Sequence, residues 1–304
     1  MAGKSREIKG RIKAVGNIQR ITKTMQMIAT ARFQAMQKRA TSAQAYTRKI
    51  AEIVGELSTS LASQGGADGN VSHPLLAPAE QADAKSLLLV ITSSRGLCGA
   101  YNANMLRRTM QFIREQGVDN LDIEAVGKKA VGYFQFNGVP LSRFHSQFGE
   151  TPKYEDVDAL VERYMSAFTA GKYQSVHVAY TAFESMSRQK PRVIRLLPLE
   201  APTAEGEPAA EAGVGEGSAD LYDFSPGPEQ LLAELLPITV KTSLFQCFNE
   251  AVVSEQLARM IAMKAATDAA GKMKKNLQRS FNRARQSAIT TELTEIIGGS
   301  AALE

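Results

Sequence analysis

The most unusual feature of this 304-residue chain is the segment Ile8-Lys-Gly-Arg-Ile-Lys-Ala-Val-Gly-Asn-Ile-Gln-Arg-Ile-Thr-Lys-Thr-Met-Gln-Met-Ile28. Apolar residues recur in it at 8, 12, 15, 18, 21, 25 and 28, and after a looser interval again at 43, 46, 50, 53 and 57. Steps of three and four are typical of a helix with one continuous apolar face. Because no proline lies between Lys4 and Leu57, the pattern predicts a helix roughly 80 Å long. Such a helix needs a partner along its length.

A second long helix is predicted after Pro237 and to about Ile297, because this span has no proline and Gly271 is its only glycine. Small residues recur along it, at Ala251, Ala258, Ala262, Ala265 and Ala269. A stripe of small side chains lets another helix approach closely. Both long helices leave the same middle part of the chain, so we expect them to pair as an antiparallel coiled coil.

Between the two helices the apolar period changes. Four short runs, three of them rich in β-branched residues, are typical of strands, at 86–92, 121–127, 174–181 and 193–199. Helical patterns alternate with them, at about 103–116, 128–137 and 155–169. Alternation of strands and helices at this spacing predicts an α/β domain with a largely parallel sheet.

The predicted fold class is therefore α/β, with a long antiparallel two-helix coiled coil from both termini and a central Rossmann-like α/β domain. Its expected parts are the N-terminal helix at 1–60, the α/β domain at 70–200, an acidic flexible loop at 201–228 and the C-terminal helix at 229–304. The loop is rich in Gly, Pro, Ala and Glu, a composition that favours a solvated segment.

Charge is segregated along the chain, although the net charge is only +5. Residues 1–58 carry twelve lysines and arginines against three glutamates, whereas residues 200–229 carry eight acids and no base. A basic helix can bind nucleic acid through phosphates. Its bases have no interleaved aromatic residue before Phe33, however, so an acidic protein surface is the expected partner and nucleic acid is not.

The composition excludes several classes of protein. No uninterrupted run approaches the ~18–20 apolar residues of a membrane helix, so no integral membrane protein is expected. The basic N-terminus has no apolar stretch typical of a secretory signal. Two cysteines are too few for a disulfide scaffold or a cysteine zinc site, and the three histidines stand at no metal-ligand spacing. We expect a cytoplasmic protein without a bound metal.

Candidate catalytic motifs are weak. Gly3-Lys4-Ser5 lacks the strand and first glycine of a phosphate-binding loop. The loop Ser93–Asn102 follows a strand and precedes a helix, where α/β folds bind ligands, but it lacks the third glycine of a dinucleotide site. We interpret it as a structural turn or contact loop. Cys98 lies beside Arg95 in this loop and is interpreted as a small residue in a tight loop. No catalytic residue and no cofactor are predicted.

Four stretches go beyond such patterns and resemble the gamma subunit of the F-type ATP synthase, of the bacterial type. They are IQRITKTMQMIA at 18–29, SRGLCGA at 94–100, SEQLARMIAMKAATD at 254–268 and RARQSAITTELTE at 283–295. The resemblance spans both termini and the middle loop in the same order. It departs at Ser300, where the family usually has alanine, and in the long acidic loop 201–228, which lacks the regulatory cysteine pair of plastid members.

The resemblance implies an architecture and partners. The two terminal helices would form the central rotor shaft inside a hexamer of alpha and beta subunits. The α/β domain would stand at the foot, on the epsilon subunit and the ring of c subunits. The chain would lie on the cytoplasmic face of the inner membrane as a peripheral, non-catalytic subunit, coupling proton flow to ATP synthesis or hydrolysis, with membrane contact only through the complex.

The resemblance also implies contacts with the beta subunits. In the C-terminal helix they map onto Arg285, Gln286 and Thr290. In the N-terminal helix the family contact with an acidic beta loop maps onto Met25, with Arg20 and Lys23 as charge partners; plain packing of Met25 is the alternative. In the middle loop it maps onto Arg95 and Cys98.

Two other classes of protein remain as alternatives. The first is a stand-alone α/β nucleotide-binding protein with helical dimerisation arms, which would form a homo-oligomer and bind its ligand by itself. The second is an adaptor for nucleic acid, whose binding would depend on salt. A braking role of the acidic loop is a further hypothesis, tested by deleting residues 203–218.

Overall fold

The computed structural model describes residues 2–64, 73–76, 84–199 and 228–301. The predicted acidic loop, except for Pro228, lies outside the described residues. The chain divides into two compact units. Unit 1 consists of Met1–Arg32, Leu97–Gly99 and Gln256–Glu304, and unit 2 consists of Phe33–Gly96 and Ala100–Glu255. The two long helices contribute to both units.

The centre of unit 2 is a five-stranded sheet in the order β3-β2-β1-β4-β5. Its strands are β1 (Lys85–Ile91), β2 (Leu121–Val126), β3 (Arg143–His145), β4 (Tyr173–Ser185) and β5 (Arg188–Leu197). The pairs β1–β2, β1–β4 and β2–β3 are parallel, and only β4–β5 is antiparallel. The prediction of a largely parallel sheet is confirmed.

The central strand β1 explains the two-layer packing of unit 2. Successive side chains of a strand point to opposite faces, so Leu87 and Leu89 join one apolar cluster while Leu88 and Val90 join the other. All four are fully buried. An uninterrupted apolar run is what a strand covered on both faces requires.

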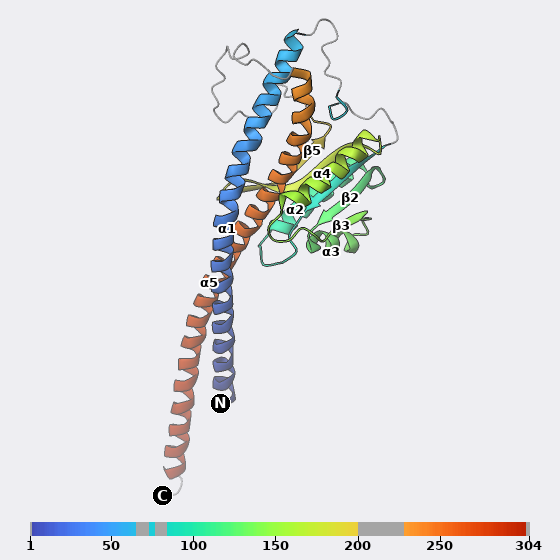
Figure 1. The fold of residues 1–304 in the computed structure, drawn as a ribbon. Coiled ribbons are helices and arrows are strands. Elements are labelled where there is room, and N and C mark those ends of the chain that lie inside the picture. The colour runs from blue at the N-terminus through green and yellow to red at the C-terminus, as the bar shows by residue number, and fades with distance from the viewer. Residues whose placement is uncertain (1, 65–72, 77–83, 200–227, 302–304) are drawn as a thin grey trace. The chain divides into compact units, whose positions relative to one another are not determined.

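Helices cover both faces of this sheet (Figure 1). On one face lie α2 (Tyr101–Gln116) and α3 (Lys128–Phe136). A short 3-10 turn at Val118–Asn120 joins α2 to β2. On the other face lie α4 (Tyr154–Thr169) and the parts of α1 and α5 that belong to unit 2. These parts contribute Leu57 from α1 and Leu244 from α5 to the core.

The two long helices are α1 (Ala2–Gln64) and α5 (Pro228–Ala301). The prediction that the second helix begins after Pro237 is wrong, because α5 continues through that proline. Proline removes one hydrogen bond and costs about 3 kcal/mol inside a helix. Leu232, Leu236 and Val240 are buried at steps of four on either side of it, and their burial offsets this cost.

Unit 1 is an antiparallel pair of helices (Figure 1). Thr267 Oγ1 donates a hydrogen bond to Thr22 Oγ1 at 2.9 Å. One turn further along α5, a Cβ at Gly271 would lie 3.1 Å from Gln19 Nε2. Position 19 of α1 thus lies beside a later position of α5 than position 22 does, so the two helices run in opposite directions. The predicted antiparallel coiled coil is confirmed.

Only part of the predicted apolar face of α1 packs in this chain, because Ile8, Ile12 and Val15 are partly buried. Ala29 is 1% exposed and Gln19 and Thr22 are partly buried, whereas Ile18 and Ile21 are 54% and 62% exposed. The partly buried positions follow one line of a helix with 3.6 residues per turn, and the exposed isoleucines lie on the neighbouring line. The alanine stripe is similarly displaced, because Ala265 and Ala269 are exposed.

Candidate functional site

The loop Leu97–Gly99 belongs to unit 1 and packs on α5. A Cβ at Gly99 would lie 3.7 Å from Ala262 Cβ. Gly99 and Leu97 both have positive φ, of 57° and 65°, and this conformation is uncommon for leucine. The loop presents Leu97, which is 62% exposed, and buries Cys98, which is 2% exposed. A contact residue in this loop would have to lie on the surface of the chain. The Cys98 thiol is buried instead.

The predicted contact residues of α1 lie near its pairing face. Arg20 and Lys23 are exposed, and Arg20 Nη2 donates a hydrogen bond to Asn17 Oδ1 at 2.6 Å. Met25 is only partly exposed. The two cations are accessible to an acidic partner, whereas Met25 is in part a packing residue of unit 1.

The predicted contact residues of α5 are all exposed. Arg285, Gln286 and Thr290 lie within two turns of one another, and Thr290 Oγ1 donates a hydrogen bond to the carbonyl oxygen of Gln286 at 3.0 Å. Exposed apolar residues accompany them, with Ile289 50% exposed and Leu293 53% exposed. This end of α5 thus presents polar and apolar side chains together.

Arg95 belongs to unit 2, where its guanidinium Nη1 lies 2.6 Å from Glu150 Oε1. Its side chain is 69% exposed. Beside this ion pair lies a cavity of about 220 Å³ at the carboxyl ends of β1 and β2, with Ile91, Val126 and Phe248 in its wall. This is the edge where an α/β sheet binds ligands. The wall also contains Glu255, so it does not form a cationic phosphate site.

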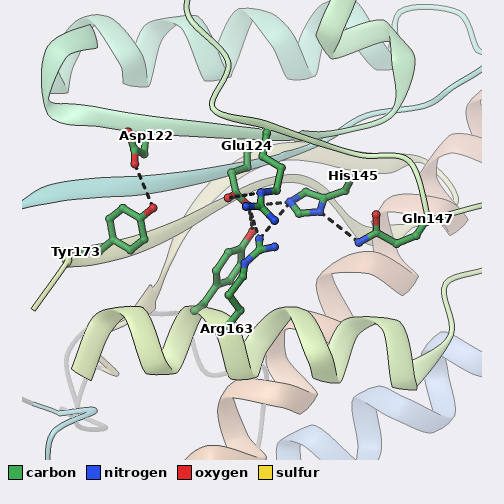
Figure 2. Close-up of polar contacts among 8 residues, drawn as sticks. Asp122, Glu124, His145, Gln147, Arg163 and Tyr173 are labelled. Carbon is green, nitrogen blue, oxygen red and sulfur yellow. Dashed lines mark hydrogen bonds and ion pairs between the residues drawn. The ribbon is translucent and has the colours of Figure 1, made fainter. Parts of the chain in front are cut away.

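The densest polar cluster of the described chain lies in unit 2 around Glu124 of β2 (Figure 2). Glu124 Oε2 accepts three hydrogen bonds, from Tyr164 Oη at 2.7 Å, His145 Nε2 at 2.7 Å and Arg163 Nη2 at 2.8 Å. Arg143 Nε lies 3.9 Å from Oε1. Two strands and α4 therefore meet at one carboxylate.

Hydrogen bonding fixes the proton positions in this cluster. A carboxylate only accepts, so His145 donates through Nε2, and its Nδ1 accepts from Gln147 Nε2 at 3.3 Å. Burial opposes ionisation of Glu124, but the hydrogen bonds from His145 and Tyr164 and the charge of Arg163 hold its pKa below the ordinary value. Burial and the same carboxylate raise the pKa of Tyr164 well above its ordinary value.

This arrangement suits anchoring better than catalysis. Glu124 is 6% exposed and its Oε2 already accepts three hydrogen bonds, so it is a poor general base. The cluster instead holds the three-residue edge strand β3 and helix α4 on β2. The sequence patterns predicted neither β3 nor this cluster. The feature that could have indicated the cluster is Glu124, an acidic residue on the inward side of a strand with buried neighbours.

The remaining buried titratable groups offer no reactive centre. Burial, together with the charge of Arg195, lowers the pKa of His177 to about 4, so its imidazole is neutral at pH 7. Burial raises the pKa of the Cys247 thiol, which keeps it protonated and unreactive. Within the described ranges, no group of three or more metal-ligating side chains comes together.

Helix α5 also contains a window of 18 residues, within Gln230–Gly298, with a mean hydropathy of 1.3. By length and composition alone this window could cross a membrane. It is weak evidence for a membrane span, because a buried core helix meets the same criterion and 44% of the window is buried in the structure.

Comparison with known proteins identifies the family. The family model described as ATP synthase matches residues 4–303. An ATP synthase gamma chain of Rhodopirellula baltica is 42% identical over 302 residues, with 99% of both chains covered, and one of Desulforamulus reducens is 38% identical over 301 residues, again with 99% of both covered. The chain belongs to the ATP synthase gamma chain family.

Chains of solved structures share the fold as well. A chain of the Euglena gracilis mitochondrial ATP synthase, in an OSCP/F1/c-ring structure, matches with a TM-score of 0.65 at 18% identity, covering 100% of this chain and 95% of that one. A chain of the Tetrahymena thermophila central stalk and c-ring matches with a TM-score of 0.54 at 20% identity, covering 81% and 99%. Membership of the gamma-chain family favours a subunit of ATP synthase over a stand-alone nucleotide-binding protein.

Proposed function

We propose that this chain is the central rotor shaft of an F-type ATP synthase and couples proton flow through the membrane ring to ATP synthesis or hydrolysis in the alpha/beta hexamer. The observation that carries the proposal is the surface of unit 1. Two helices pair antiparallel there, yet apolar side chains remain at least half exposed on both of them. They are Ile18 and Ile21 on α1 and Ile289 and Leu293 on α5. Exposed apolar side chains in such number mark a surface that a partner covers.

The mechanism follows from symmetry. A single shaft of two unlike helices cannot contact three identical beta subunits in the same way. At each angle it therefore favours a different conformation, and a different nucleotide affinity, at each site. The coupling consists only of the difference in contact free energy between beta conformations. Turning the shaft changes which site binds nucleotide tightly.

The pairing of the helices suits the transmission of torque. Ala29 on α1 and Ala270 on α5 are buried at 1% and 8% exposure, and small side chains bring two helix axes close. Hydrogen bonding of Thr267 to Thr22 joins the helices across this contact. A closely packed pair bends less than one helix, so an angular displacement at one end reaches the other.

The proposed contacts with beta subunits are the exposed residues Arg285, Gln286 and Thr290 of α5 and the exposed cations Arg20 and Lys23 of α1. Met25 contributes to both the helix pair and the partner surface. In the middle loops, Arg95 remains a proposed contact, and Leu97 presents the side chain that Cys98 does not.

The proposed partners are the alpha and beta subunits around the shaft, and the epsilon subunit and c-subunit ring at its foot. The chain is non-catalytic in this proposal, and the nucleotide sites belong to the hexamer. It is a peripheral protein on the cytoplasmic face of the inner membrane, and it touches the membrane only through the complex.

The test is reconstitution of ATP hydrolysis from alpha and beta subunits with and without this chain. We expect slow hydrolysis without it and fast, continuous turnover with it, together with co-purification as a large complex. A matched control is the chain truncated before residue 285, which keeps the Thr22–Thr267 contact and lacks the proposed contacts of α5. Equal hydrolysis with and without the chain, or stoichiometric nucleotide binding by the chain alone, would overturn the proposal.

A further inference from the structure

The β4–β5 hairpin of unit 2 extends beyond the rest of the sheet. The last residues paired between β1 and β4 are Val90 and Ala179, whereas β4 continues to Ser185. At about 3.3 Å per residue, the part of β4 after Ala179 projects roughly 20 Å past Val90. We call residues 181–192 the hairpin extension. None of the predicted contact residues lies in it, and the proposed rotor function makes no use of it.

Contacts with α1 and α5 hold the hairpin extension in place. The Phe183 ring packs edge-on against the Phe33 ring of α1, with the ring centroids 6.1 Å apart. The Phe183 N–H donates to Glu250 Oε2 at 3.3 Å. Ser254 Oγ donates to the carbonyl oxygen of Thr181 at 3.2 Å. The side chains of the extension are therefore presented on an anchored backbone, so a partner that binds them orders little additional structure.

Three cations of the hairpin extension surround a single carboxylate, that of Glu184. Its Oε2 lies 3.0 Å from Arg188 Nε, and its Oε1 lies 3.5 Å from Lys190 Nζ. Arg192 Nη2 contacts the same Oε1, and the three cationic side chains are 64%, 44% and 37% exposed. Desolvation opposes the ionisation of Glu184, but the charges of its three neighbours hold its pKa below the ordinary value. Glu184 is therefore ionised at pH 7, and three cations against one carboxylate leave two positive charges uncompensated.

The neighbouring turn of α1 adds to this positive charge. The turn at 37–41 and the hairpin extension line one small hollow, which also includes Glu250 of α5. Lys38 and Arg39 of this turn are exposed. Among the described side chains of this region, five cations thus stand against two carboxylates, Glu184 and Glu250. Such an excess of one sign favours an anionic partner.

Protection of the sheet edge explains only part of this composition. β5 is an edge strand, and charges together with a proline such as Pro191 prevent an edge from pairing with another chain. Edge protection requires no exposed apolar residue, however, and Met186 at the turn is 57% exposed. Methionine and arginine are both enriched in protein interfaces. An exposed Met186 beside Arg188 is therefore typical of a surface that contacts another protein.

The position of the hairpin extension indicates which protein it meets. β4 runs parallel to β1, so the extension leaves the sheet at the same edge as the loop after β1, which contains the proposed beta-subunit contact Arg95. The acidic residues at 200–229 of this chain are a competing partner. However, β5 runs from Arg188 to Leu197 away from this edge, over roughly 30 Å at about 3.3 Å per residue. An acidic segment that follows β5 would have to return along its whole length, so a beta subunit is the better placed partner.

We propose that the hairpin extension docks on an acidic surface segment of a beta subunit; the inference rests on the proposed rotor function. Carboxylates of the partner pair with Arg188 and Lys190, and Met186 packs against apolar atoms at the same contact. Exposed ion pairs are weak and are screened by salt, which suits a contact that is made and released as the shaft turns. Such charges affect the rate of encounter and its salt dependence more than the final affinity.

A zero-length cross-link identifies the partner. A carbodiimide joins the Lys190 amine to a contacting carboxylate as an amide, and the reagent takes up the water that is lost. We apply it to the complex reconstituted from alpha subunits, beta subunits and the full-length chain, and to the chain alone, and identify the linked peptides by mass spectrometry. In the complex we expect Lys190 joined to an aspartate or glutamate of a beta subunit, in addition to the link to Glu184 that its 3.5 Å contact permits. Links confined to Glu184, to residues 200–229 or to an alpha subunit overturn the proposal.

Charge reversal measures the contribution of the contact. ATP hydrolysis by alpha and beta subunits is followed as the full-length chain is added. At low ionic strength we expect Arg188→Glu with Lys190→Glu to raise the half-saturating concentration of the chain at least about 10-fold, and the difference to fall below about 2-fold in ~0.5 M salt. The matched control is Arg114→Glu with Lys172→Glu, which reverses two exposed cations at the opposite edge of the sheet, where α2 ends and β4 begins. It should leave the half-saturating concentration unchanged.

The outcomes separate this inference from the proposed function. If the wild-type chain stimulates hydrolysis and the hairpin variant has the same half-saturating concentration, the docking proposal is wrong and the proposed function stands. If the wild-type chain gives no stimulation, both are wrong. A difference that persists undiminished in ~0.5 M salt contradicts an ionic contact. Thermal unfolding of both variants verifies that they are folded.

Discussion

Replacing Gly127 by alanine is expected to destabilise unit 2 strongly. Gly127 follows β2 and has a φ of +91° with a ψ of 135°, a conformation that side chains rarely adopt. A Cβ there would lie 2.2 Å from the carbonyl oxygen of Thr92 and 2.8 Å from its Oγ1. Thr92 cannot easily move away, because its Oγ1 donates to the carbonyl oxygen of Val126 at 3.0 Å and accepts from the N–H of Ala130 at 3.1 Å.

Two contributions set the magnitude for Gly127→Ala. A positive φ costs a non-glycine residue roughly 1–3 kcal/mol. Forcing a methyl group into a fixed backbone costs typically another 1–3 kcal/mol. We therefore expect a loss of about 2–6 kcal/mol in the free energy of unfolding, a large part of the roughly 5–15 kcal/mol of an ordinary domain.

Two other glycines separate these contributions. Gly138 has a φ of +67° but no atom within 4 Å of its Cβ position, so Gly138→Ala should cost only the backbone term of about 1–2 kcal/mol. Gly132, inside α3, also has open space and no positive φ, so Gly132→Ala should stabilise the helix by about 0.5–1 kcal/mol.

The assay is urea unfolding of the full-length chain followed by near-ultraviolet circular dichroism of tyrosine. Every tyrosine in the described ranges belongs to unit 2, so the signal reports on that unit. A Gly127→Ala variant that loses no more stability than Gly138→Ala would refute the steric argument. It would show that the loop after β2 can move away from Thr92.

Three further predictions concern the buried cluster, the thiols and the proposed contacts. Glu124→Gln should lower the free energy of unfolding at pH 7 by about 2–3 kcal/mol, because three charge-assisted hydrogen bonds weaken. Since the folded pKa of Glu124 is depressed below 4.5, this difference should be full above pH 4.5 and disappear as the pH falls through the folded value; urea unfolding that shows no such pH dependence contradicts it. Cys98 and Cys247, both buried, should react with a thiol reagent at least about 10-fold more slowly in the native chain than in denaturing urea, and equal rates would show that the thiols are accessible. Arg285→Ala with Gln286→Ala should lower ATP hydrolysis by the reconstituted hexamer about 5-fold or more while leaving thermal unfolding of the isolated chain unchanged, and unchanged hydrolysis would remove both residues from the proposed contact surface.

The central strands could be predicted because their signal is local. β1 is a continuous apolar run, and an apolar run bounded by polar residues specifies a strand buried on both faces. β3 carries no such signal, since Arg143 and Phe144 are exposed and only His145 is buried. This strand forms on pairing with β2, and the contact of His145 with Glu124 joins residues 21 positions apart. No local pattern contains that information.

The start of α5 shows the same limit in another form. Proline is a reliable local signal against a helix, and for this reason the helix was predicted to begin after Pro237. The structure continues the helix upstream because Leu232, Leu236 and Val240 pack into the core of unit 2. Each buried side chain of this kind contributes roughly 1.5–3 kcal/mol, so three of them outweigh one proline.

The pairing face of α1 was the hardest feature to predict, and the reason bears on function. Apolar residues lie on two adjacent lines of this helix, one containing Ile8, Ile12 and Val15 and the other containing Ile18 and Ile21. Steps of three and four fit both lines, so the apolar pattern predicted a single face. In the structure this chain partly covers the first line, whereas Ile18 and Ile21 on the second line are exposed. A helix that forms one interface needs only one apolar line. The exposed second line of α1 is therefore expected if α1 packs on α5 and also contacts surrounding subunits.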